Sequence, residues 1–489
     1  MSRARIQKVL VANRSEIACR IFQACKEMGL RTVGIVAPGD EEARHVTYAD
    51  ELQAVAGYLD IPAVVQAAQR AGASLIHPGY GFLSERPEFA DAVEKAGICF
   101  VGPRAETMRL MGGKIAAKEL ATSEKIPTLP WARVPRGGDL KSAARKIGFP
   151  LLLKASAGGG GKGMRRVDRI EELESVAESA SAEAVSAFGD GTLFLERLVV
   201  KPRHIEVQVF GDGRGDGIHL HERECSLQRR HQKVWEEATA PHLKDEIRQG
   251  LFDSALRLVR KVKYRGAGTI EFLVDQSGEY FFLEMNTRLQ VEHPVTELVT
   301  GVDLVWAQIA QAQTPQEIIL KHVPEARGVA IEVRLYAEDP SQGFIPTPGR
   351  VEQLRWPTGA GIRVESGIEA GQTLGTQFDS MLGKLVVWAE NRDHAIARLQ
   401  FALRETVILG VGTNQNYLQA IAEHPAVREG RVHTGFLEEK FSDFAPAPSA
   451  SELGLLTQAR TEGMARNSGM SGEAAELPSP WRSFSKGIL

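Results

Sequence analysis

Cysteine is scarce in this sequence, and long apolar runs are missing. Its 489 residues include four scattered cysteines, Cys19, Cys25, Cys99 and Cys225, with no C-x-x-C pair and no clustering with histidine. This argues against a disulfide framework or a thiolate metal site, so we interpret the four as small buried apolar residues. The N-terminal run KVLVA is too short for a signal-peptide core or a membrane span. These absences predict a cytoplasmic protein with no membrane partner.

The sequence also lacks an excess of charge of either sign. The formal net charge is −3, with 25% charged and 43% hydrophobic residues. A nearly neutral chain has no general attraction for nucleic acid or anionic lipid, which favours small-molecule or protein partners. The composition is typical of an α/β enzyme, and the length predicts roughly three domains.

Glycine is plentiful, and the segment KASAGGGGKGM, residues 154–164, follows an apolar strand-like run, PLLLK. Gly158, Gly160 and Gly163 have G-x-G-x-x-G spacing, which alone is weak evidence for a nucleotide site. A dinucleotide-binding loop leads directly into a helix. Here MRRV indicates a second short strand, and Asp168 is predicted to cap the helix that follows.

A P-loop is excluded as well, because Gly163 stands where Ser or Thr would bind magnesium. A glycine flap on a hairpin remains, with backbone N–H groups that can close onto phosphates. Lys154 and Lys162 add positive charge at its edges. A merely flexible turn would need only one or two glycines.

The first hundred residues alternate between strand and helix patterns. KVLVANR predicts a strand, Ser15 is the predicted N-cap of a helix to about Met28, and RTVGIVA predicts another strand. A second cycle follows, with ASLIHPGYGFLSE, a helix from Pro87 to Ala96, and ICFVGP. This pattern predicts a parallel α/β domain whose carboxyl-end loops collect ligands.

Two later segments alternate polar and apolar residues. In HIEVQVF, His204, Glu206 and Gln208 alternate with apolar residues. In YFFLEMNTRLQVEHP, the same periodicity predicts two faces. One face would carry Phe281, Leu283 and Met285, and the other Glu284, Asn286 and Arg288, continuing in register toward Gln290 and Glu292.

A further carboxylate, Glu271, lies in the middle of the apolar strand GTIEFLV. A carboxylate in such a place is costly unless it is paired or bound to a metal. Glu271, Glu284 and Asn286 offer hard oxygen ligands, which magnesium prefers when it bridges nucleotide phosphates. The nucleotide and metal interpretations therefore converge.

Five segments carry a family resemblance: IHPGYGFLSE, KASAGGGGKGM, ECSLQRRHQK, EMNTRLQVEHPVTE and EVRLYAEDP. In this order and spacing they closely resemble the biotin carboxylase component of biotin-dependent acyl-CoA carboxylases, from about Lys8 to Glu439. The resemblance implies an α/β (α+β) ATP-grasp fold. Its parts would be a Rossmann-like parallel N-terminal domain (1–112), an ATP-binding domain (113–325) with a mobile glycine-rich lid (about 130–198), a mixed α/β C-terminal domain (326–442), and a tail (443–489).

The resemblance implies a ligase reaction, in which ATP and bicarbonate form carboxyphosphate and the ureido nitrogen of biotin is carboxylated. Lys114 and Lys154 would neutralise phosphates. The lid glycines Gly158, Gly159, Gly160, Gly161 and Gly163 would close over them. His231 would lie near these phosphates. Glu196 and the backbone of Arg197 and Leu198 would receive the adenine, with His204 and Gln228 on the ribose side. Glu271, Glu284 and Asn286 would hold one or two Mg²⁺ (or Mn²⁺) ions.

At the other end, the resemblance implies a bicarbonate site formed by Lys233, Arg288, Gln290 and the backbone of Val291. Glu292 would be the base. Arg334 would stabilise the enolate-like oxygen of biotin, and Tyr80 and Asp379 would lie near the biotin.

The sequence contains no Met-Lys pair, which a biotin-carrying motif of the Ala-Met-Lys-Met type requires. We therefore expect biotin to arrive on a separate carrier protein, with a separate carboxyltransferase subunit as a further partner. The resemblance also implies a homodimer. Trp481 and Phe484 in the tail suggest partner docking. The final acceptor, whether acetyl-, propionyl-, methylcrotonyl-CoA or another acyl group, stays open.

Three alternative functions share part of this pattern. Another ATP-grasp ligase, such as half of a carbamoyl-phosphate synthetase or a peptide-type ligase, would share the lysines, flap and carboxylates but lack RLQVEHP and the Arg334 motif. A dinucleotide oxidoreductase is disfavoured by the strand after the flap. A non-catalytic binding subunit would be expected to lose Glu284, Arg288 or Glu292, and all three are present.

Overall fold

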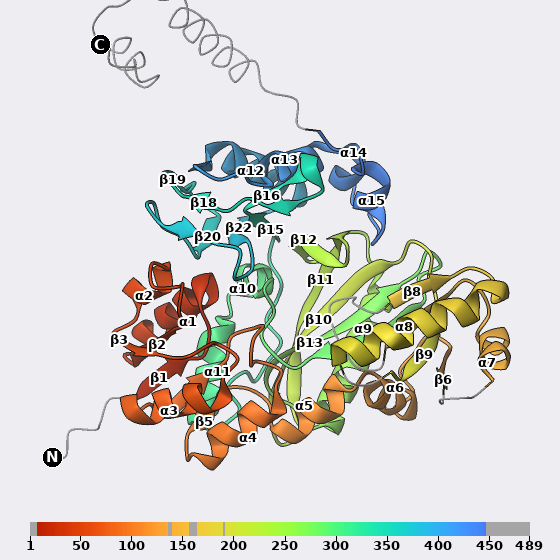
Figure 1. Ribbon diagram of the computed structural model, residues 1–489, viewed down its shortest axis with the longest axis horizontal. Coiled ribbons are helices and arrows are strands. Elements are labelled where there is room, and N and C mark those ends of the chain that lie inside the picture. The colour runs from red at the N-terminus through yellow and green to blue at the C-terminus, as the bar shows by residue number, and fades with distance from the viewer. Residues whose placement is uncertain (1–6, 135–138, 156–163, 189–190, 446–489) are drawn as a thin grey trace, which may run out of the picture. The chain divides into compact units, whose positions relative to one another are not determined.

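The first hundred residues form a five-stranded parallel sheet in the computed structural model, which describes residues 7–134, 139–155, 164–188 and 191–445 (Figure 1). The strand order β3-β2-β1-β4-β5 confirms the predicted parallel α/β domain. The strands are β1 (Lys8–Val11), β2 (Arg31–Val36), β3 (Glu51–Ala54), β4 (Leu75–His77) and β5 (Cys99–Phe100). The helices are α1 (Ser15–Glu27), α2 (Arg44–Tyr48), α3 (Ile61–Ala71), α4 (Pro87–Lys95) and α5 (Ala105–Gly112).

The start of α1 differs from the prediction. Ser15 is not the N-cap but the first helical residue, with a left-handed φ of 58°. The N-cap is Arg14, whose guanidinium instead binds Asp40, with 2.6 Å between Nε and Oδ2. Before it, the Asn13 amide donates to the carbonyls of Pro78 and Tyr80 at 2.8 and 2.7 Å. These contacts fix the turn after β1 and leave Ser15 in a conformation that an N-cap does not adopt.

A separate four-stranded antiparallel sheet, in the order β6-β9-β7-β8, occupies residues 131–197. It consists of β6 (Trp131–Val134), β7 (Leu151–Ala155), β8 (Met164–Val167) and β9 (Leu193–Arg197), packed with α7 (Leu140–Ile147) and α8 (Leu173–Phe188). The β7–β8 hairpin confirms the predicted strand after the glycine loop. The loop glycines Gly158, Gly159, Gly160, Gly161 and Gly163 lie outside the described residues.

The N-cap prediction for Asp168 is also wrong. A short 3-10 turn, η1 (Ile170–Glu172), precedes α8, and its N-cap is Arg169. The Asp168 carboxylate accepts a hydrogen bond from Nε of Arg166 at 2.8 Å. The neighbouring arginine takes the oxygen that would otherwise cap the helix.

The largest element is an eight-stranded antiparallel sheet in the order β14-β13-β10-β11-β12-β15-β22-β20. The strands are β10 (Arg203–Asp212), β11 (Gly217–Arg229), β12 (Gln232–Ala238), β13 (Arg265–Val274), β14 (Tyr280–Asn286), β15 (Val329–Tyr336), β20 (Ile362–Ser366) and β22 (Met381–Ala389). Because β12 pairs with β15, the sheet continues across the predicted domain boundary at residue 325.

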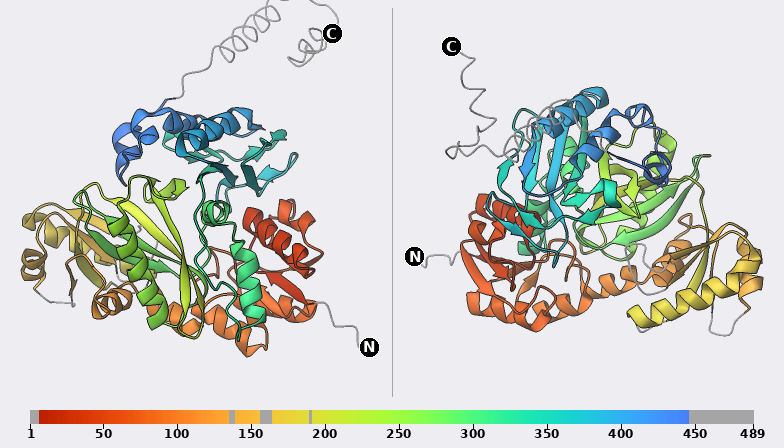
Figure 2. Two further views of the ribbon diagram at one scale, coloured as in Figure 1. Left: turned by 180° about the vertical axis from the view of Figure 1, so that it is seen from behind. Right: turned by 45° about the horizontal axis from the view of Figure 1, so that its top comes forward.

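Helices cover this sheet and bury its apolar side chains (Figure 2). α9 (Asp245–Lys261) lies along β10 and β11, and α12 (Arg392–Glu405) along β15 and β22. The other helices are α6 (Lys114–Ser123), α10 (His293–Thr300), α11 (Leu304–Gln313), α13 (Gln415–Glu423), α14 (Pro425–Arg428) and α15 (Phe436–Lys440). Short elements complete the C-terminal part: β16 (Glu338–Asp339), η2 (Pro340–Gln342), β17 (Ile345–Pro346), β18 (Gly349–Arg350), β19 (Gln353–Arg355), β21 (Thr373–Leu374) and β23 (Val407–Leu409).

β14 departs from the predicted alternation. Glu284 pairs with Glu271, but Phe282 rather than Leu283 pairs with Phe272, so the strand contains a bulge at Leu283. An extra residue reverses the phase of a strand. Consequently Phe282 and Met285 are buried in the core, whereas Phe281 and Leu283 are half-buried. The strand also ends at Asn286, so the segment 287–292 reaches the site as a turn and not in register with β14.

In the part of the chain that the structure describes, no helix is long and apolar enough to cross a membrane.

Candidate active site

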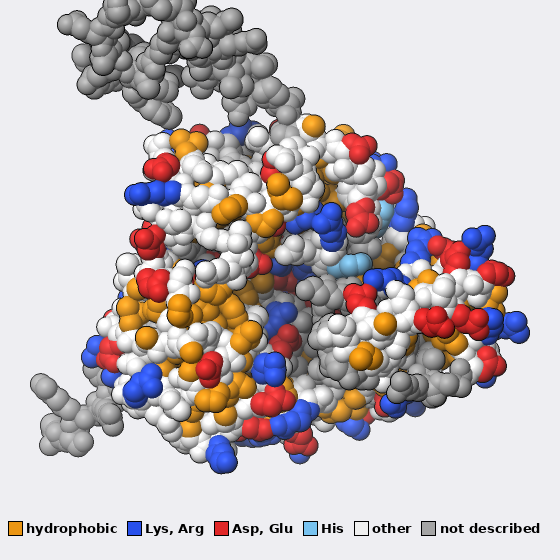
Figure 3. Space-filling view, viewed as in Figure 1, with side chains coloured by type: hydrophobic (Ala, Val, Ile, Leu, Met, Phe, Trp, Pro, Cys, Tyr) orange, Lys and Arg blue, Asp and Glu red, His pale blue; other side chains and the backbone are white. Residues whose placement is uncertain are grey.

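Three adjoining cavities bring the predicted site residues into one row. The first, of about 220 Å³, is lined by Lys154, Glu196 and Leu198 among others. The central cavity, of about 750 Å³, shares with it Lys114, His204, Gln228, His231, Glu271 and Glu284. The third, of about 490 Å³, shares with the central one Arg288, Val291 and Arg334. Figure 3 shows charged side chains gathered in the hollowed part of this face.

A row of carboxylates crosses three strands beside the central cavity, which two of them, Glu271 and Glu284, line. Glu206 on β10 lies opposite Glu271 on β13, which lies opposite Glu284 on β14. Like charges in directly opposite positions repel. The arrangement is therefore stable only with cations close by, and the structure supplies some of them.

The Lys233 ammonium is the principal cation of the row. Its Nζ lies 2.6 Å from Glu206, 3.0 Å from Glu271 and 2.6 Å from Glu292. Burial alone lowers the pKa of Lys233, but these three carboxylates raise it well above its ordinary value. Lys233 therefore remains charged and holds the three carboxylates close to one another.

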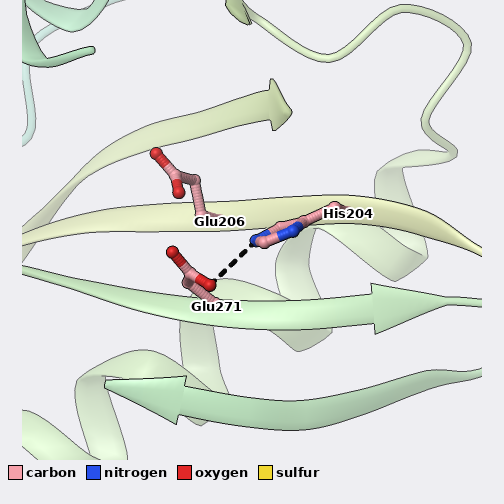
Figure 4. A group of neighbouring side chains, drawn as sticks. All are labelled: His204, Glu206 and Glu271. Carbon is pink, nitrogen blue, oxygen red and sulfur yellow. Dashed lines mark ion pairs between the residues drawn. The ribbon is translucent and has the colours of Figure 1, made fainter. Parts of the chain in front are cut away.

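Among the residues that the structure describes, two groups of side chains have the mutual spacing of metal ligands, and one is drawn in Figure 4: His204, Glu206 and Glu271. His204 Nε2 lies 3.0 Å from the Glu271 carboxylate. The second group is Glu206, Cys225 and Glu292. Burial raises the pKa of the Cys225 thiol well above its ordinary value, so no thiolate is available there. Lys233 already contacts a carboxylate of each group, so neither requires a metal for charge balance.

The predicted metal ligands lie at the other end of the row. Asn286 donates to Glu271 Oε1 at 2.9 Å, and Glu284 is the cross-strand neighbour of Glu271. Burial first, and then the Glu271 charge, raise the pKa of Glu284, which Lys114 only partly offsets. Glu284 thus carries negative charge that its neighbours do not fully compensate, beside the oxygen donors of Glu271 and Asn286, and this combination suits a divalent magnesium or manganese ion. The residues present fit the predicted metal.

Glu292 lies just before α10 and is fully buried. Burial by itself raises its pKa, but Lys233, Arg334 and Arg223 hold the pKa of Glu292 well below its ordinary value. Arg334 Nη2 donates to Glu292 at 3.0 Å, and its Nε donates to Glu236 at 2.7 Å. Glu292 is therefore an ionised carboxylate held between two cations that both line the central cavity.

Arg288 and Gln290 reach the same cavity from the turn after β14. Arg288 Nη1 donates to the Gln290 side chain at 2.7 Å, and Gln290 Nε2 donates to Glu271 at 3.2 Å. The carbonyl of Val291 accepts a hydrogen bond from the buried Lys384 at 2.8 Å. Residues 288–292 are thereby fixed although they lie outside a strand.

At the opposite end, the first cavity holds the predicted adenine and phosphate residues. Gln228 Nε2 lies 2.8 Å from His204 Nδ1, and Lys154 forms an ion pair with Glu196. The amide N–H groups of Arg197 and Leu198 already donate to Pro130 and Pro150, at 2.9 and 3.0 Å. Both amides are therefore engaged within the protein and are not free for the predicted backbone contact with an adenine. The carbonyls of these residues, or the backbone of Val199 in the same cavity, are left for that contact.

The third cavity brings together Tyr80 and Asp379, which are far apart in the sequence, with Arg288, Val291 and Arg334. Tyr80 belongs to the turn that Asn13 anchors after β4. Asp379 accepts a hydrogen bond from the Met381 amide at 2.8 Å, at the start of β22. The two residues predicted at the biotin end therefore share a cavity with Arg334.

Comparison with known proteins agrees with this geometry. Three family models match: the biotin carboxylase N-terminal domain at residues 5–108, the ATP-binding domain of carbamoyl-phosphate synthase L chain at 113–317, and the biotin carboxylase C-terminal domain at 332–439. A biotin carboxylase of Pseudomonas aeruginosa is 44% identical over 444 residues, which covers 89% of this chain and 98% of the relative. The chain belongs to the biotin carboxylase family.

Longer family members match as well. The mitochondrial methylcrotonoyl-CoA carboxylase subunit alpha of Dictyostelium discoideum is 44% identical over 88% of this chain, which spans 63% of that subunit's length. The biotin carboxylase domain dimer of Hydrogenobacter thermophilus 2-oxoglutarate carboxylase, solved with magnesium ADP, ADP and bicarbonate, superposes with a TM-score of 0.86 at 42% identity. That alignment covers 91% of this chain and 100% of the domain.

Membership of the biotin carboxylase family confirms the resemblance and the ATP-grasp fold, and it decides against the alternative ligase and oxidoreductase interpretations.

The sequence interpretation missed several charged residues of the site. Arg223 is fully buried and donates to Glu206, Gln208 and Thr296, at 2.5, 2.7 and 2.8 Å. Glu236 holds Arg334, and Lys118 contacts Glu196. Their partners lie on other strands, so local spacing gave no signal for Arg223 or Glu236.

Proposed function

We propose that this chain catalyses the ATP-, magnesium- and bicarbonate-dependent carboxylation of biotin held by a separate carrier protein. This would be the first half-reaction of an acyl-CoA carboxylase. The observation that carries the proposal is the position of Glu292: an ionised base between Lys233 and Arg334, in a cavity that joins the nucleotide end to the Tyr80–Asp379 end. A single row can hold ATP, bicarbonate and biotin in the order in which they react.

For the nucleotide, Lys114 and Lys154 would bind phosphate oxygens, with His231 nearby. The adenine and ribose would be surrounded by Glu196, Arg197, Leu198, His204 and Gln228. A bound magnesium or manganese ion would neutralise phosphate charge, held by Glu271, Glu284 and Asn286. The cavity lining supports this division, because Lys114 and Glu284 border both the first and the central cavity. Phosphate groups would therefore lie where these two cavities meet.

Bicarbonate would lie in the central cavity against Lys233, Arg288, Gln290 and the backbone of Val291. Glu292 would accept its proton, which leaves an oxygen able to attack the terminal phosphate of ATP. The low pKa of Glu292 keeps the base ionised at neutral pH. Lys233 and Arg288 would offset the negative charge that approaches the phosphate.

Biotin would enter the third cavity. Arg334, whose guanidinium borders both this cavity and the central one, would stabilise the enolate-like oxygen that forms when the ureido nitrogen loses its proton. Tyr80 and Asp379 would line the approach. The proton acceptor in that step would be the phosphate released from carboxyphosphate.

The finer assignments belong to the same proposal. We propose a domain division at residues 112, 325 and 442, a lid at about 130–198, a homodimer, and a carboxyltransferase as further partner. The free state of Cys19, Cys25, Cys99 and Cys225 is consistent with the cytoplasmic location that we propose. The tail from residue 443 would serve as a linker or partner-docking segment.

The proposal is tested with the purified chain, ATP, magnesium and isotopically labelled bicarbonate. We expect label on a biotinylated carrier domain and none on the same domain without biotin. Arg288→Ala should lose both bicarbonate-dependent ATP cleavage and label transfer, whereas Arg334→Ala should retain ATP binding and lose mainly the transfer. Equal losses in both steps for both variants would contradict the assignment, and covalent biotin on this chain would contradict the separate carrier.

A further inference from the structure

Glu196 is clamped between two lysines in the first cavity. One carboxylate oxygen contacts Lys154 of β7, and the other contacts Lys118 of α6. All three side chains are buried, with exposed fractions of 8% for Lys154, 3% for Lys118 and 1% for Glu196. Buried charges of this kind are costly unless they are paired, so the cluster is a built feature of the cavity.

The two lysines come from different parts of the fold. Lys154 and Glu196 lie on neighbouring strands of the four-stranded sheet, where Leu152 pairs with Glu196 and Lys154 with Phe194. Lys118 comes from outside that sheet, one turn of α6 after Lys114, and therefore on the same helix face. The Lys118–Glu196 ion pair thus links α6 to the end of β9.

The cluster contains more positive than negative charge. Lys114, Lys118 and Lys154 line the cavity with Glu196, while Glu284 lies at its border with the central cavity. Burial raises the pKa of Glu196, but Lys154 and Lys118 hold it below its ordinary value, so the carboxylate is ionised. Burial lowers the pKa of Lys118, and Glu196 opposes that effect.

A phosphate-binding Lys154 must leave Glu196, at least in part, when ATP arrives. Removing one partner of a buried ion pair strongly destabilises the charge that is left behind. With Lys118 in place, Glu196 keeps a cation after Lys154 has moved. Without Lys118, the carboxylate would hold Lys154 as its sole buried partner and compete with the phosphate.

We propose that Lys118 is a positioning residue for ATP: it retains Glu196 so that Lys154 is free to bind phosphate. This inference rests on the proposed function only in taking Lys154 as a phosphate ligand. It assigns to Lys118 an effect on nucleotide affinity, exerted through Glu196 and without contact to the substrate.

The test compares Lys118→Met, Glu196→Gln and the double variant. Equilibrium binding of ATP is measured by calorimetry without bicarbonate or biotin, and KM and kcat by bicarbonate-dependent ATP cleavage. We expect Lys118→Met to weaken ATP binding about tenfold, with a smaller change in kcat, which is a typical coupling within one ionic network. Adenosine, which has no phosphate, should bind equally well to wild type and variant.

The double variant decides between positioning and general damage. If Lys118 acts through Glu196, the Lys118→Met change should have no further effect on ATP affinity in the Glu196→Gln background, and the double variant should bind ATP better than Lys118→Met alone. The matched control is Lys141→Met. It removes an exposed lysine of α7, a helix packed on the four-stranded sheet, whose partner Glu174 lies on α8. It should leave ATP affinity unchanged.

Several results would overturn the inference: unchanged ATP affinity in Lys118→Met, equal loss of adenosine binding, or a double variant no better than the single one. If Lys118→Met alone does not fold, Lys118→Gln takes its place, because it keeps a hydrogen-bond donor for Glu196 but removes the charge; unchanged ATP affinity in that variant would overturn the inference. Failure of the proposed function would look different. Wild type would then bind ATP, with the Lys118 effect intact, but would show no bicarbonate-dependent turnover.

Discussion

Lys233 is the residue on which the charge balance of the site depends. It contacts three buried carboxylates that come from β10, β13 and the start of α10. Each carboxylate alone would be costly in this interior, and Glu206 and Glu271 are direct cross-strand neighbours. A cation at their centre therefore holds together the segments that would meet the phosphate and the bicarbonate.

Glu284 is the member of the carboxylate row whose charge is least compensated, because its pKa is raised despite Lys114. Glu284→Gln should remove the negative charge that would hold a divalent cation and lower turnover by about 10²–10³-fold, while metal-free ATP binding persists. The measurement is ATP cleavage over a range of magnesium concentrations. Glu279→Gln, an exposed residue just before β14, is the matched control. Near-normal turnover of Glu284→Gln would contradict the metal assignment.

Glu236 predicts a dependence on pH. Burial raises its pKa to about 7, although Arg334 opposes this effect. Above that pH the carboxylate is ionised and holds Arg334, and below it protonation removes the ion pair. The biotin-dependent step should therefore slow as the pH falls through about 7.

The variant Glu236→Gln, which is neutral at every pH, should be several-fold slower in the biotin-dependent step and lose that acid limb. Glu237→Gln serves as control, because Glu237 pairs with Arg392 instead of Arg334. Rate–pH profiles of the three proteins provide the measurement. An unchanged acid limb in Glu236→Gln would show that another group causes it.

At the residue scale, the sequence predicted many of the residues that line the three cavities, because its motifs place these residues close together in the sequence: Glu284 to Glu292 within nine positions, and Gln228 to Lys233 within six. It could not predict which charges neutralise them. Glu236 meets Arg334 only through strand pairing between β12 and β15, and Lys118 meets Glu196 only through an ion pair between α6, which packs against β14, and β9 of the four-stranded sheet.

At the scale of elements, the predicted strands and helices were found, but their phases and starting points were less predictable. Because of the bulge at Leu283, Phe282 of β14 is buried in place of Phe281. The periodicity of the sequence cannot reveal such an inserted residue. The bulge leaves Glu284 facing Glu271, so the predicted metal ligands still meet. The turn after Asn286 then turns the chain toward α10 and brings Glu292 beside Lys233.

The start of α1 provides a test of element-level strain. Ser15 has a φ of 58°, a conformation that costs an L-residue about 1–2 kcal/mol and glycine little. Ser15→Gly should therefore increase the free energy of unfolding by about 1 kcal/mol in denaturant titrations. Ser15→Ala keeps the same strain and should give no gain. A less stable Ser15→Gly protein would mean that the serine side chain stabilises this turn by more than its backbone strain costs.

At the scale of the whole molecule, the eight-stranded sheet explains how distant motifs act together. The predicted ATP-binding and C-terminal domains share this sheet through the β12–β15 pair, so Arg334 on β15 reaches Glu292 and Glu236 directly. The parallel sheet adds Tyr80 to the third cavity. The sequence predicted the order of the domains along the chain. It could not predict that two of them share one sheet, because the paired residues of β12 and β15 are more than 90 positions apart in the sequence.

In the function that we propose, one row of cavities couples ATP cleavage to bicarbonate and biotin. The most direct measurement is ATP cleavage by the purified chain with magnesium, with and without bicarbonate, and with and without free biotin. We expect ATP cleavage that depends on bicarbonate and increases when biotin is added. A rate of ATP cleavage that does not change with bicarbonate, or that requires a different acceptor, would contradict the proposed function.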